Sequence, residues 1–119
     1  MSPHLEEQLQ RDYPEMFQEL YGDMSVTCMA FGLECSDGWY DILVSLCRQI
    51  KENKDESVIF NQIKEKWGTL TIYHSGGTEE SDMLVVAAEA ASRTICEVCG
   101  TAGELSTNGW HKVRCEEHT

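Results

Sequence analysis

Two short clusters of cysteine and histidine near the end of the chain carry residues that can bind a metal ion. Cys96 and Cys99 are separated by two residues, and after fifteen intervening residues Cys115 and His118 repeat that spacing. Two intervening residues let the chain turn back, so both side chains of a pair point to one centre, and Gly100 follows the first pair where a left-handed residue is often needed. Three thiolates and one imidazole suit tetrahedral Zn²⁺. The spacing therefore predicts a closed structural zinc site.

Alternatives to a structural zinc site are open at this stage. Disulfides or free thiols are disfavoured, because the chain shows no signal peptide and paired cysteines in a cytosolic protein are more often metal or redox sites. A catalytic zinc needs an open coordination position, and four protein ligands leave none. The three other cysteines match no metal spacing and are expected to be small buried hydrophobic residues: Cys28, Cys35 and Cys47.

Catalytic groups of other kinds are scarce. Besides His118, the chain has His4, His74 and His111. Only His74 has a neighbouring hydroxyl, that of Ser75, on which it could act as a base. The sequence has no glycine-rich phosphate loop and no paired-carboxylate motif. We therefore expect a protein without enzymatic activity.

The charge of the chain restricts its partners. Its 119 residues carry a formal net charge of −12, and 41% of them are hydrophobic, which indicates one small folded domain. Binding to duplex DNA is disfavoured, because phosphate contacts supply most of that affinity. The acids are concentrated in residues 1–57, whereas residues 58–75 carry a small positive charge from Lys64 and Lys66. No apolar run is long enough to cross a bilayer, so a soluble cytoplasmic protein is expected.

The first half of the chain is expected to be helical. Apolar residues at steps of three or four in the first 20 positions predict an amphipathic helix that breaks near Asp12. A second helix is expected to begin at Pro14 and to end at Gly22. A turn at residues 36–39, with Asp37 as a cap, leads into a further helix. The apolar face of that helix should be the centre of the core: Ile42, Leu43, Leu46, Cys47 and Ile50.

The sequence of the second half of the chain predicts a β-hairpin, then a helix, then the metal module. Residues 58–74 alternate and turn at Gly68, which predicts a β-hairpin with Ile59, Ile63 and Trp67 on its packed face. Residues 78–94 predict a helix that leads directly into Cys96. Its packed side is expected to be Met83, Leu84, Val86, Ala87, Ala90 and Ala91, and the metal module is expected to contain a strand with Trp110 and Val113.

These elements predict a single α+β domain over residues 1–119. A small helical domain packed on a β-hairpin is expected over residues 1–95, and a zinc-stapled knuckle module over residues 96–119. A two-stranded ribbon is not stable alone in water, so its apolar face must pack on the helices. Its polar face is then available to solvent or to a ligand.

Four sequence blocks, and the order in which they follow one another, carry a resemblance to a known family. They are Tyr13-Pro14 with Met16-Phe17, residues 31–40 (FGLECSDGWY), residues 62–70 (QIKEKWGTL), and the two metal-ligand pairs with Gly109-Trp110. Together they resemble a family of small uncharacterised proteins encoded by bacteriophages and prophages. The resemblance covers nearly the whole chain and implies an accessory protein that acts in the host bacterial cytoplasm. The chain departs from the pattern at Trp67, where Phe is expected, and at Thr71-Ile72, where Arg followed by an aromatic residue is usual.

The sequence favours a binding protein, in one of three versions. In the first, the acidic surface of residues 6–56 covers a basic site on a host protein, such as a component of antiviral defence, and inhibits it. In the second, the protein sequesters a nucleotide signal, and in the third it is a nucleic-acid-binding zinc protein. A homo-oligomer is compatible with any of them. The nucleotide version would use cations and aromatic side chains: Lys64, Lys66, Trp67, Tyr73 and Arg93.

Overall fold

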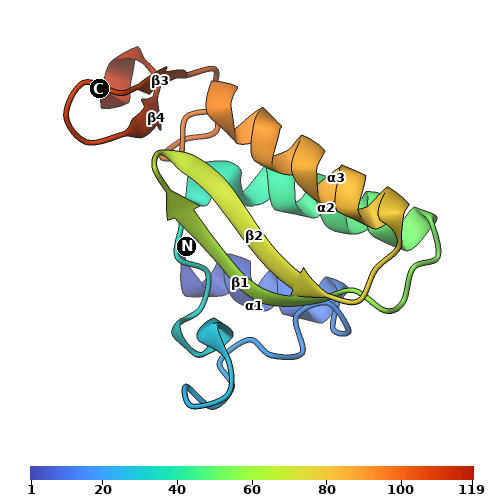
Figure 1. Cartoon of the computed structure of the whole chain (residues 1–119). Helices are drawn as coiled ribbons and strands as arrows, with labels where there is room; N and C mark the ends of the chain where they lie inside the picture. Colours follow the sequence, from blue (N-terminus) through green and yellow to red (C-terminus); the bar gives the residue numbers. More distant parts are fainter.

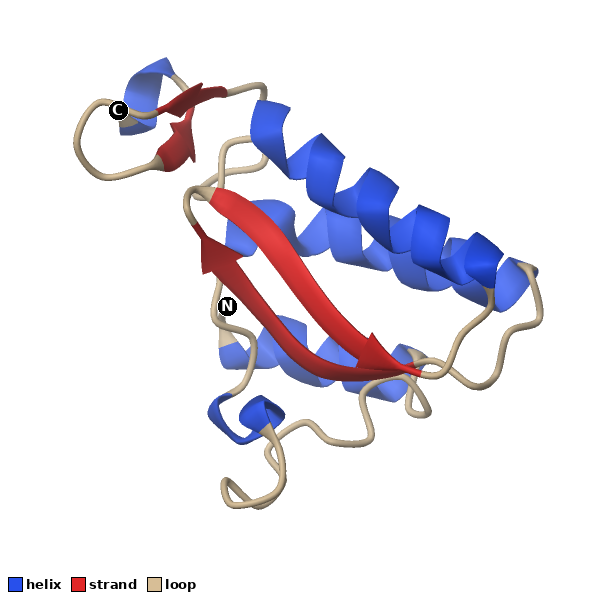
Figure 2. Cartoon of the chain, in the orientation of Figure 1, coloured by secondary structure: helices blue, strands red, loops and turns tan.

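The computed structural model describes residues 1–119 and shows an α+β fold with three α-helices and two small antiparallel sheets (Figure 1). Helices α2 and α3 pack against each other, α3 also packs along β2, and the two short strands of the metal module project beyond one end of the hairpin (Figure 2). None of the helices combines the length and the apolar character needed to cross a lipid bilayer. The elements are α1 (Pro3–Asp12), α2 (Tyr40–Glu52), β1 (Ile59–Lys66), β2 (Thr69–Ser75), α3 (Glu79–Ala91), β3 (Glu104–Ser106) and β4 (Lys112–Arg114).

Helix α2 provides the centre of the core. Its five predicted core residues, from Ile42 to Ile50, are all buried, and Trp39, immediately before the helix, is fully buried. The expected cap by Asp37 is wrong, because this carboxylate instead accepts hydrogen bonds from the backbone N–H and the hydroxyl of Ser2. Asp37 therefore ties the start of α1 to the start of α2.

The segment after α1 differs from the prediction. The helix does end at Asp12, but residues 14–21 form a series of turns, so the second helix expected from Pro14 is wrong. The carbonyl of Met16 accepts a hydrogen bond from the N–H of Phe60, at 2.9 Å, and Phe17 packs its ring against Phe60. This chain segment is held by β1, and a continuous helix would withdraw that carbonyl from the strand.

Strands β1 and β2 form the predicted hairpin, with Trp67 and Gly68 at its turn. Both residues have positive φ, 54° and 82°, which is the geometry of a type I′ turn. A bulge between Phe60 and Gln62 interrupts the alternation of side chains. As a result Phe60 and Ile63, three residues apart, both face the core.

The packed face of the hairpin therefore differs from the prediction at two of three positions. Ile63 is fully buried, but Ile59 is only partly buried and Trp67 is exposed at the tip. The bulge moves Ile59 out of phase with Ile63, and the turn directs Trp67 to solvent. The opposite strand supplies the remaining packed residues, Leu70 and Ile72.

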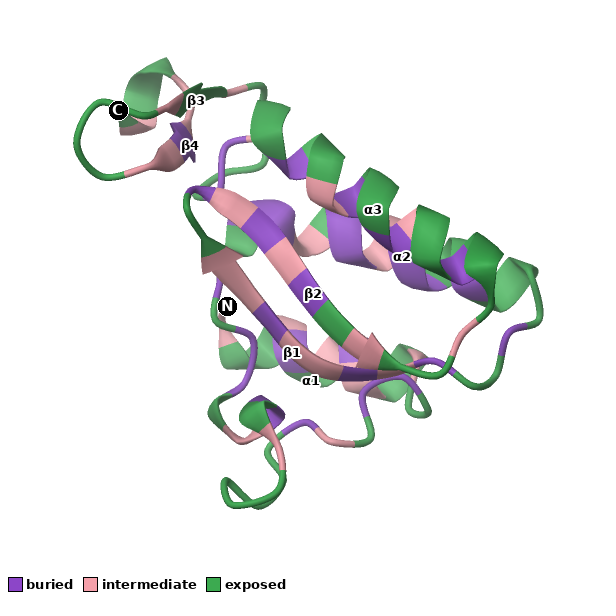
Figure 3. Cartoon of the chain, viewed as in Figure 1, coloured by how far each residue is buried: buried purple, intermediate pink, exposed green.

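Helix α3 packs on the core through a different face from the predicted one. Its buried residues are Ser81, Val85 and Ala88, followed by Ser92 just beyond the helix, whereas most of the expected face is exposed (Figure 3). Hydrogen bonds explain this orientation. Ser81 donates to the buried carboxylate of Asp55, and Ser92 accepts from the N–H of Leu70. The helix thus satisfies polar groups that the core would otherwise leave unpaired.

Candidate metal centre

The four predicted ligands lie together although they come from two separate chain segments. The sulfur and nitrogen atoms of Cys96, Cys99, Cys115 and His118 all lie within 4.8 Å of one another. The Sγ atoms of Cys99 and Cys115 are 3.7 Å apart, and Nδ1 of His118 is 3.7 Å from Sγ of Cys96. Two sulfurs on a tetrahedral zinc are about 3.8 Å apart when each Zn–S bond is about 2.3 Å. These separations suit one metal ion shared by four ligands, and they are too long for disulfides.

Local backbone structure directs the first pair of ligands. The N–H of Gly100, which has φ of 81°, donates to the carbonyl of Cys96 at 2.9 Å and closes the turn between the two cysteines. Burial alone would raise the pKa of the Cys96 thiol, but the backbone N–H groups of Cys115, Cys99 and Val98 lower that pKa to about 6. Since a thiolate is the form that binds metal, the backbone prepares this sulfur for its role.

The second pair of ligands is held by β4 and by the turn that follows it. β4 pairs with β3 in an antiparallel register that places Val113 opposite Leu105, and Val113 is fully buried. The N–H of Glu97 donates to the carbonyl of Val113, so the two ligand-bearing segments are hydrogen-bonded to each other. Trp110 precedes β4 and is 80% exposed, so its expected place in the strand is wrong.

Comparison of the chain with protein-family models, curated proteins and solved structures finds no match. The assignment of a metal centre therefore depends on geometry and ligand chemistry. The geometry shows a cluster that can hold a metal ion.

Glu97, between the first two ligands, joins the metal module to the core. Its carboxylate is buried and accepts hydrogen bonds from the N–H of Ser36, at 3.0 Å, and from the guanidinium of Arg114, at 3.2 Å. Its backbone carbonyl accepts from the N–H of Gly38 at 2.7 Å. Gly38 leaves no room for a Cβ atom, which would overlap the carbonyls of Cys96 and Glu97. The module is thus in backbone contact with the turn that begins α2.

The cysteines outside the cluster have the expected chemistry in two cases of three. Cys35 and Cys47 are buried, and burial raises the pKa of the Cys35 thiol to about 12 and also raises that of Cys47. Cys28 is exposed, which contradicts the expectation of a buried thiol. It lies in a short 3₁₀ turn whose apolar contact with the core is made by its neighbour, Met29.

The structure separates the residues predicted to bind a nucleotide. Lys64, Lys66 and Tyr73 lie on the side of the hairpin that faces away from the core residues Ile63 and Ile72. Arg93 lies instead on the α3 side of β2, where it lines a depression of about 300 Å³ with Thr69 and Thr71. The lining of this depression does not include Lys64, Lys66, Trp67 or Tyr73.

Trp67 stands at the hairpin tip, where it meets the metal module. Its ring contacts the ring of His111 edge to face, with 5.5 Å between ring centres, and it is 72% exposed. Gly68 beside it fits closely against Leu105 and the backbone of His111 and Lys112, leaving no space for a Cβ atom. Sequence reasoning missed His111 as a neighbour of this tip. No local pattern signals a contact between residues more than forty positions apart.

His74, the one histidine considered as a base, is not paired with Ser75. Its Nε2 atom lies 3.3 Å from the carboxylate of Asp82, and its buried Nδ1 atom has no hydrogen-bond partner. The histidine connects β2 to the first turn of α3. This contact gives it a structural role.

Proposed function

We propose that the cluster holds one structural Zn²⁺ and that the protein is a non-catalytic accessory protein of the phage type. It binds a host component, such as an antiviral defence protein, through its acidic surface and inhibits it. Zinc is favoured because three thiolates and one imidazole fill a tetrahedral shell and leave no open position for catalysis. Such a metal stabilises a binding surface and takes no part in a reaction.

The observation that supports acidic binding is the lack of compensation among the carboxylates. In residues 6–56 most acids are exposed, and only Glu52 pairs with a basic side chain, Arg48 at 3.8 Å. Uncompensated charge speeds association with a basic partner and weakens as salt screens it. The exposed acids of this region are Glu7, Asp12, Glu15, Asp23, Glu34, Asp37, Asp41, Glu52 and Glu56.

The test is capture of proteins from a bacterial lysate on the immobilised chain, followed by elution with a salt gradient. A specific basic partner should be retained at low salt and released as salt rises. The variant Glu7→Gln/Asp12→Asn/Glu15→Gln removes three charges from the α1 region and should no longer retain the partner. The matched control Glu104→Gln/Glu116→Gln/Glu117→Gln removes three charges from the metal module and should retain it. Equal retention by both variants would contradict the proposal.

Trp67 favours a second candidate function, the binding of a nucleotide. A bulky residue with positive φ in a type I′ turn is strained by about 1–2 kcal/mol, and such strain is often retained for function. Here it holds an indole in solvent beside Lys66 and His111. A base could stack on the indole while the lysine meets a phosphate.

Tryptophan fluorescence tests this second candidate. Titration with adenosine and guanosine monophosphates should quench emission, and Trp67→Ala should abolish the saturable part. Trp110→Ala, which removes the other exposed indole, is the control for non-specific quenching. Quenching that does not saturate, or that is equal in both variants, would exclude a site at the tip.

A further inference from the structure

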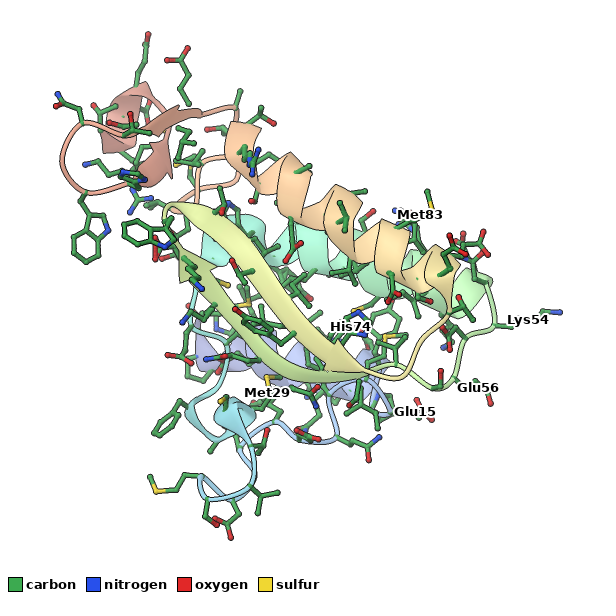
Figure 4. All side chains as sticks on the ribbon, in the orientation of Figure 1. Glu15, Met29, Lys54, Glu56, His74 and Met83 are labelled. Carbon is green, nitrogen blue, oxygen red and sulfur yellow. The ribbon has the colours of Figure 1, made fainter.

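Helix α3 turns its more apolar face to solvent. Two serines, Ser81 and Ser92, belong to its packed side. Met83 and Val86, by contrast, are 67% and 63% exposed. Ala90, one turn after Val86, is exposed as well. Figure 4 shows the side chain of Met83 directed away from the body of the protein. An outward apolar face on a helix that is otherwise well anchored indicates a surface that another helix covers.

The exposed residues follow the spacing of a helix-packing seam. Glu79, Met83, Val86 and Ala90 of α3, and Arg93 in the 3₁₀ turn that follows the helix, are separated by four, three, four and three residues, the pattern by which two helices pack side by side. The seam has a definite orientation on the helix. Val86, Ala90 and Arg93 line the depression toward β2. The groove toward α2 is lined from α3 by a second set, Leu84, Ala87, Ala88 and Ala91.

We propose that this seam is a homodimer interface, in which α3 packs antiparallel against α3 of a second copy. With a two-fold axis beside Val86, this residue faces its own symmetry mate, and Met83 packs over the partner's Ala90. The same register places Glu79 beside the partner's Arg93. Each copy thus brings the acidic first turn of α3 to the 3₁₀ turn that follows α3 in the other copy.

Charge complementarity and helix dipoles favour a second copy as the occupant. Glu79 and Arg93 stand at opposite ends of one seam, so an antiparallel pair forms two opposite-charge contacts, whereas a parallel pair forms like-charge contacts. The dipoles of antiparallel helices also attract. The small side chain of Ala90 lets the helices approach closely.

The size of the seam predicts a weak, reversible dimer. A 13-residue helix is about 20 Å long and about 10 Å wide, so each partner buries on the order of 200 Å². The total is below the range of stable complexes and matches transient ones. We therefore expect a dissociation constant of about 10–100 μM.

The experiment is sedimentation equilibrium of the full chain from about 1 μM to about 1 mM, with charge-swap variants. The wild-type chain should change from monomer to dimer over this range. Glu79→Arg and Arg93→Glu should each weaken dimerisation about tenfold, because each variant homodimer places like charges together twice. An equal mixture of the two variants should recover the wild-type affinity, because the heterodimer restores both opposite-charge contacts.

Two further variants make the test specific to this face. Glu80→Arg makes the same charge change in the same helical turn, but its position follows the α2 side of the helix, so dimerisation should be unchanged. Val86→Glu places two charges at the axis and should abolish the dimer, while the melting temperature of the dilute chain stays the same. A chain that is monomeric at every concentration would overturn the proposal. A dimer unaffected by Val86→Glu, or a mixture that does not recover, would also overturn it.

Discussion

The indole N–H of Trp39 donates a hydrogen bond to the carbonyl oxygen of Ile95, 3.0 Å away. Trp39 is fully buried against the start of α2, and Ile95 immediately precedes the first metal ligand, Cys96. The largest side chain of the core is thus hydrogen-bonded to the backbone of the residue that immediately precedes the metal module. Changes at the Cys/His cluster are therefore expected to alter the stability of the whole domain.

Replacement of a metal ligand tests this coupling. Cys99→Ser should reduce zinc from about one per chain to below half, and should destabilise the fold by several kcal/mol, because metal binding contributes directly to folding. Zinc content by mass spectrometry and thermal unfolding of the same sample measure both effects. Cys28→Ser is the matched control, since that exposed thiol lies outside the cluster. Unchanged metal content and stability in Cys99→Ser would contradict a structural metal.

Gly38 gives a test of the contact between module and core that does not change a ligand. Gly38→Ala should destabilise the fold by about 2–4 kcal/mol, because the added Cβ must displace the carbonyls of Cys96 and Glu97. Gly109→Ala is the control. Gly109 has φ of 80° but nothing within 4 Å of an added Cβ, so only a conformational cost of about 1 kcal/mol applies. Chemical denaturation compares the two, and equal losses would show that the close approach is unimportant.

Asp55 predicts a dependence of stability on pH. Its carboxylate accepts hydrogen bonds from the hydroxyls of Ser57 and Ser81 and from the N–H groups of Ser57 and Thr78, and these hold the pKa of Asp55 well below its ordinary value. The stabilisation is present above the unfolded-state pKa of about 3.9, and it is lost as pH falls through the folded-state pKa.

Asp55→Asn should therefore cost about 1–3 kcal/mol at pH 7. Below pH of about 4 the difference from the wild-type chain should shrink, because the unfolded wild-type chain then binds a proton at Asp55 that the folded chain does not bind. Denaturant unfolding of both chains from pH 7 to below pH of about 4 measures this difference in the free energy of unfolding. A constant difference at all pH values would show that the ionised form of Asp55 is not what stabilises the loop.

Replacement of Trp67 at the hairpin turn is expected to increase the stability of the fold. Trp67→Asn should stabilise the hairpin by about 0.5–1 kcal/mol, because Asn tolerates positive φ and Asn-Gly is the preferred pair in a type I′ turn. Urea denaturation measures the change. Trp110→Asn, at a residue that is exposed without positive φ, should leave stability unchanged. A destabilised Trp67→Asn would mean that the contact with His111 outweighs the backbone strain.

The sequence predicted those features that depend on spacing within one short segment. Each Cys/His pair was predicted correctly because its spacing determines a local turn, and the core face of α2 was correct because Ile42, Leu46 and Ile50 recur at helical intervals beside charged residues. The hairpin turn was found for a similar reason. Gly68 supplies one of the two positive φ values that the turn requires.

The features that failed depend on contacts distant in sequence. The face of α3 was predicted from hydrophobicity, but hydrogen bonds from Ser81 to Asp55 and from Leu70 to Ser92 decide which side is packed. In β1, the bulge stabilised by Met16 shifted the alternation. No pattern in a short window contains these interactions.

The contacts of residues 36–39 have a consequence for synthesis on the ribosome. The N–H of Ser36 and the indole of Trp39 find their partners 61 and 56 residues later in the chain. At about 5–20 residues per second, translation therefore leaves these groups without native partners for several seconds. The helices and the hairpin can associate during that time, but the domain cannot close until residues 95–97 have emerged. A nascent chain stalled before that point should be sensitive to proteases and to chaperone binding.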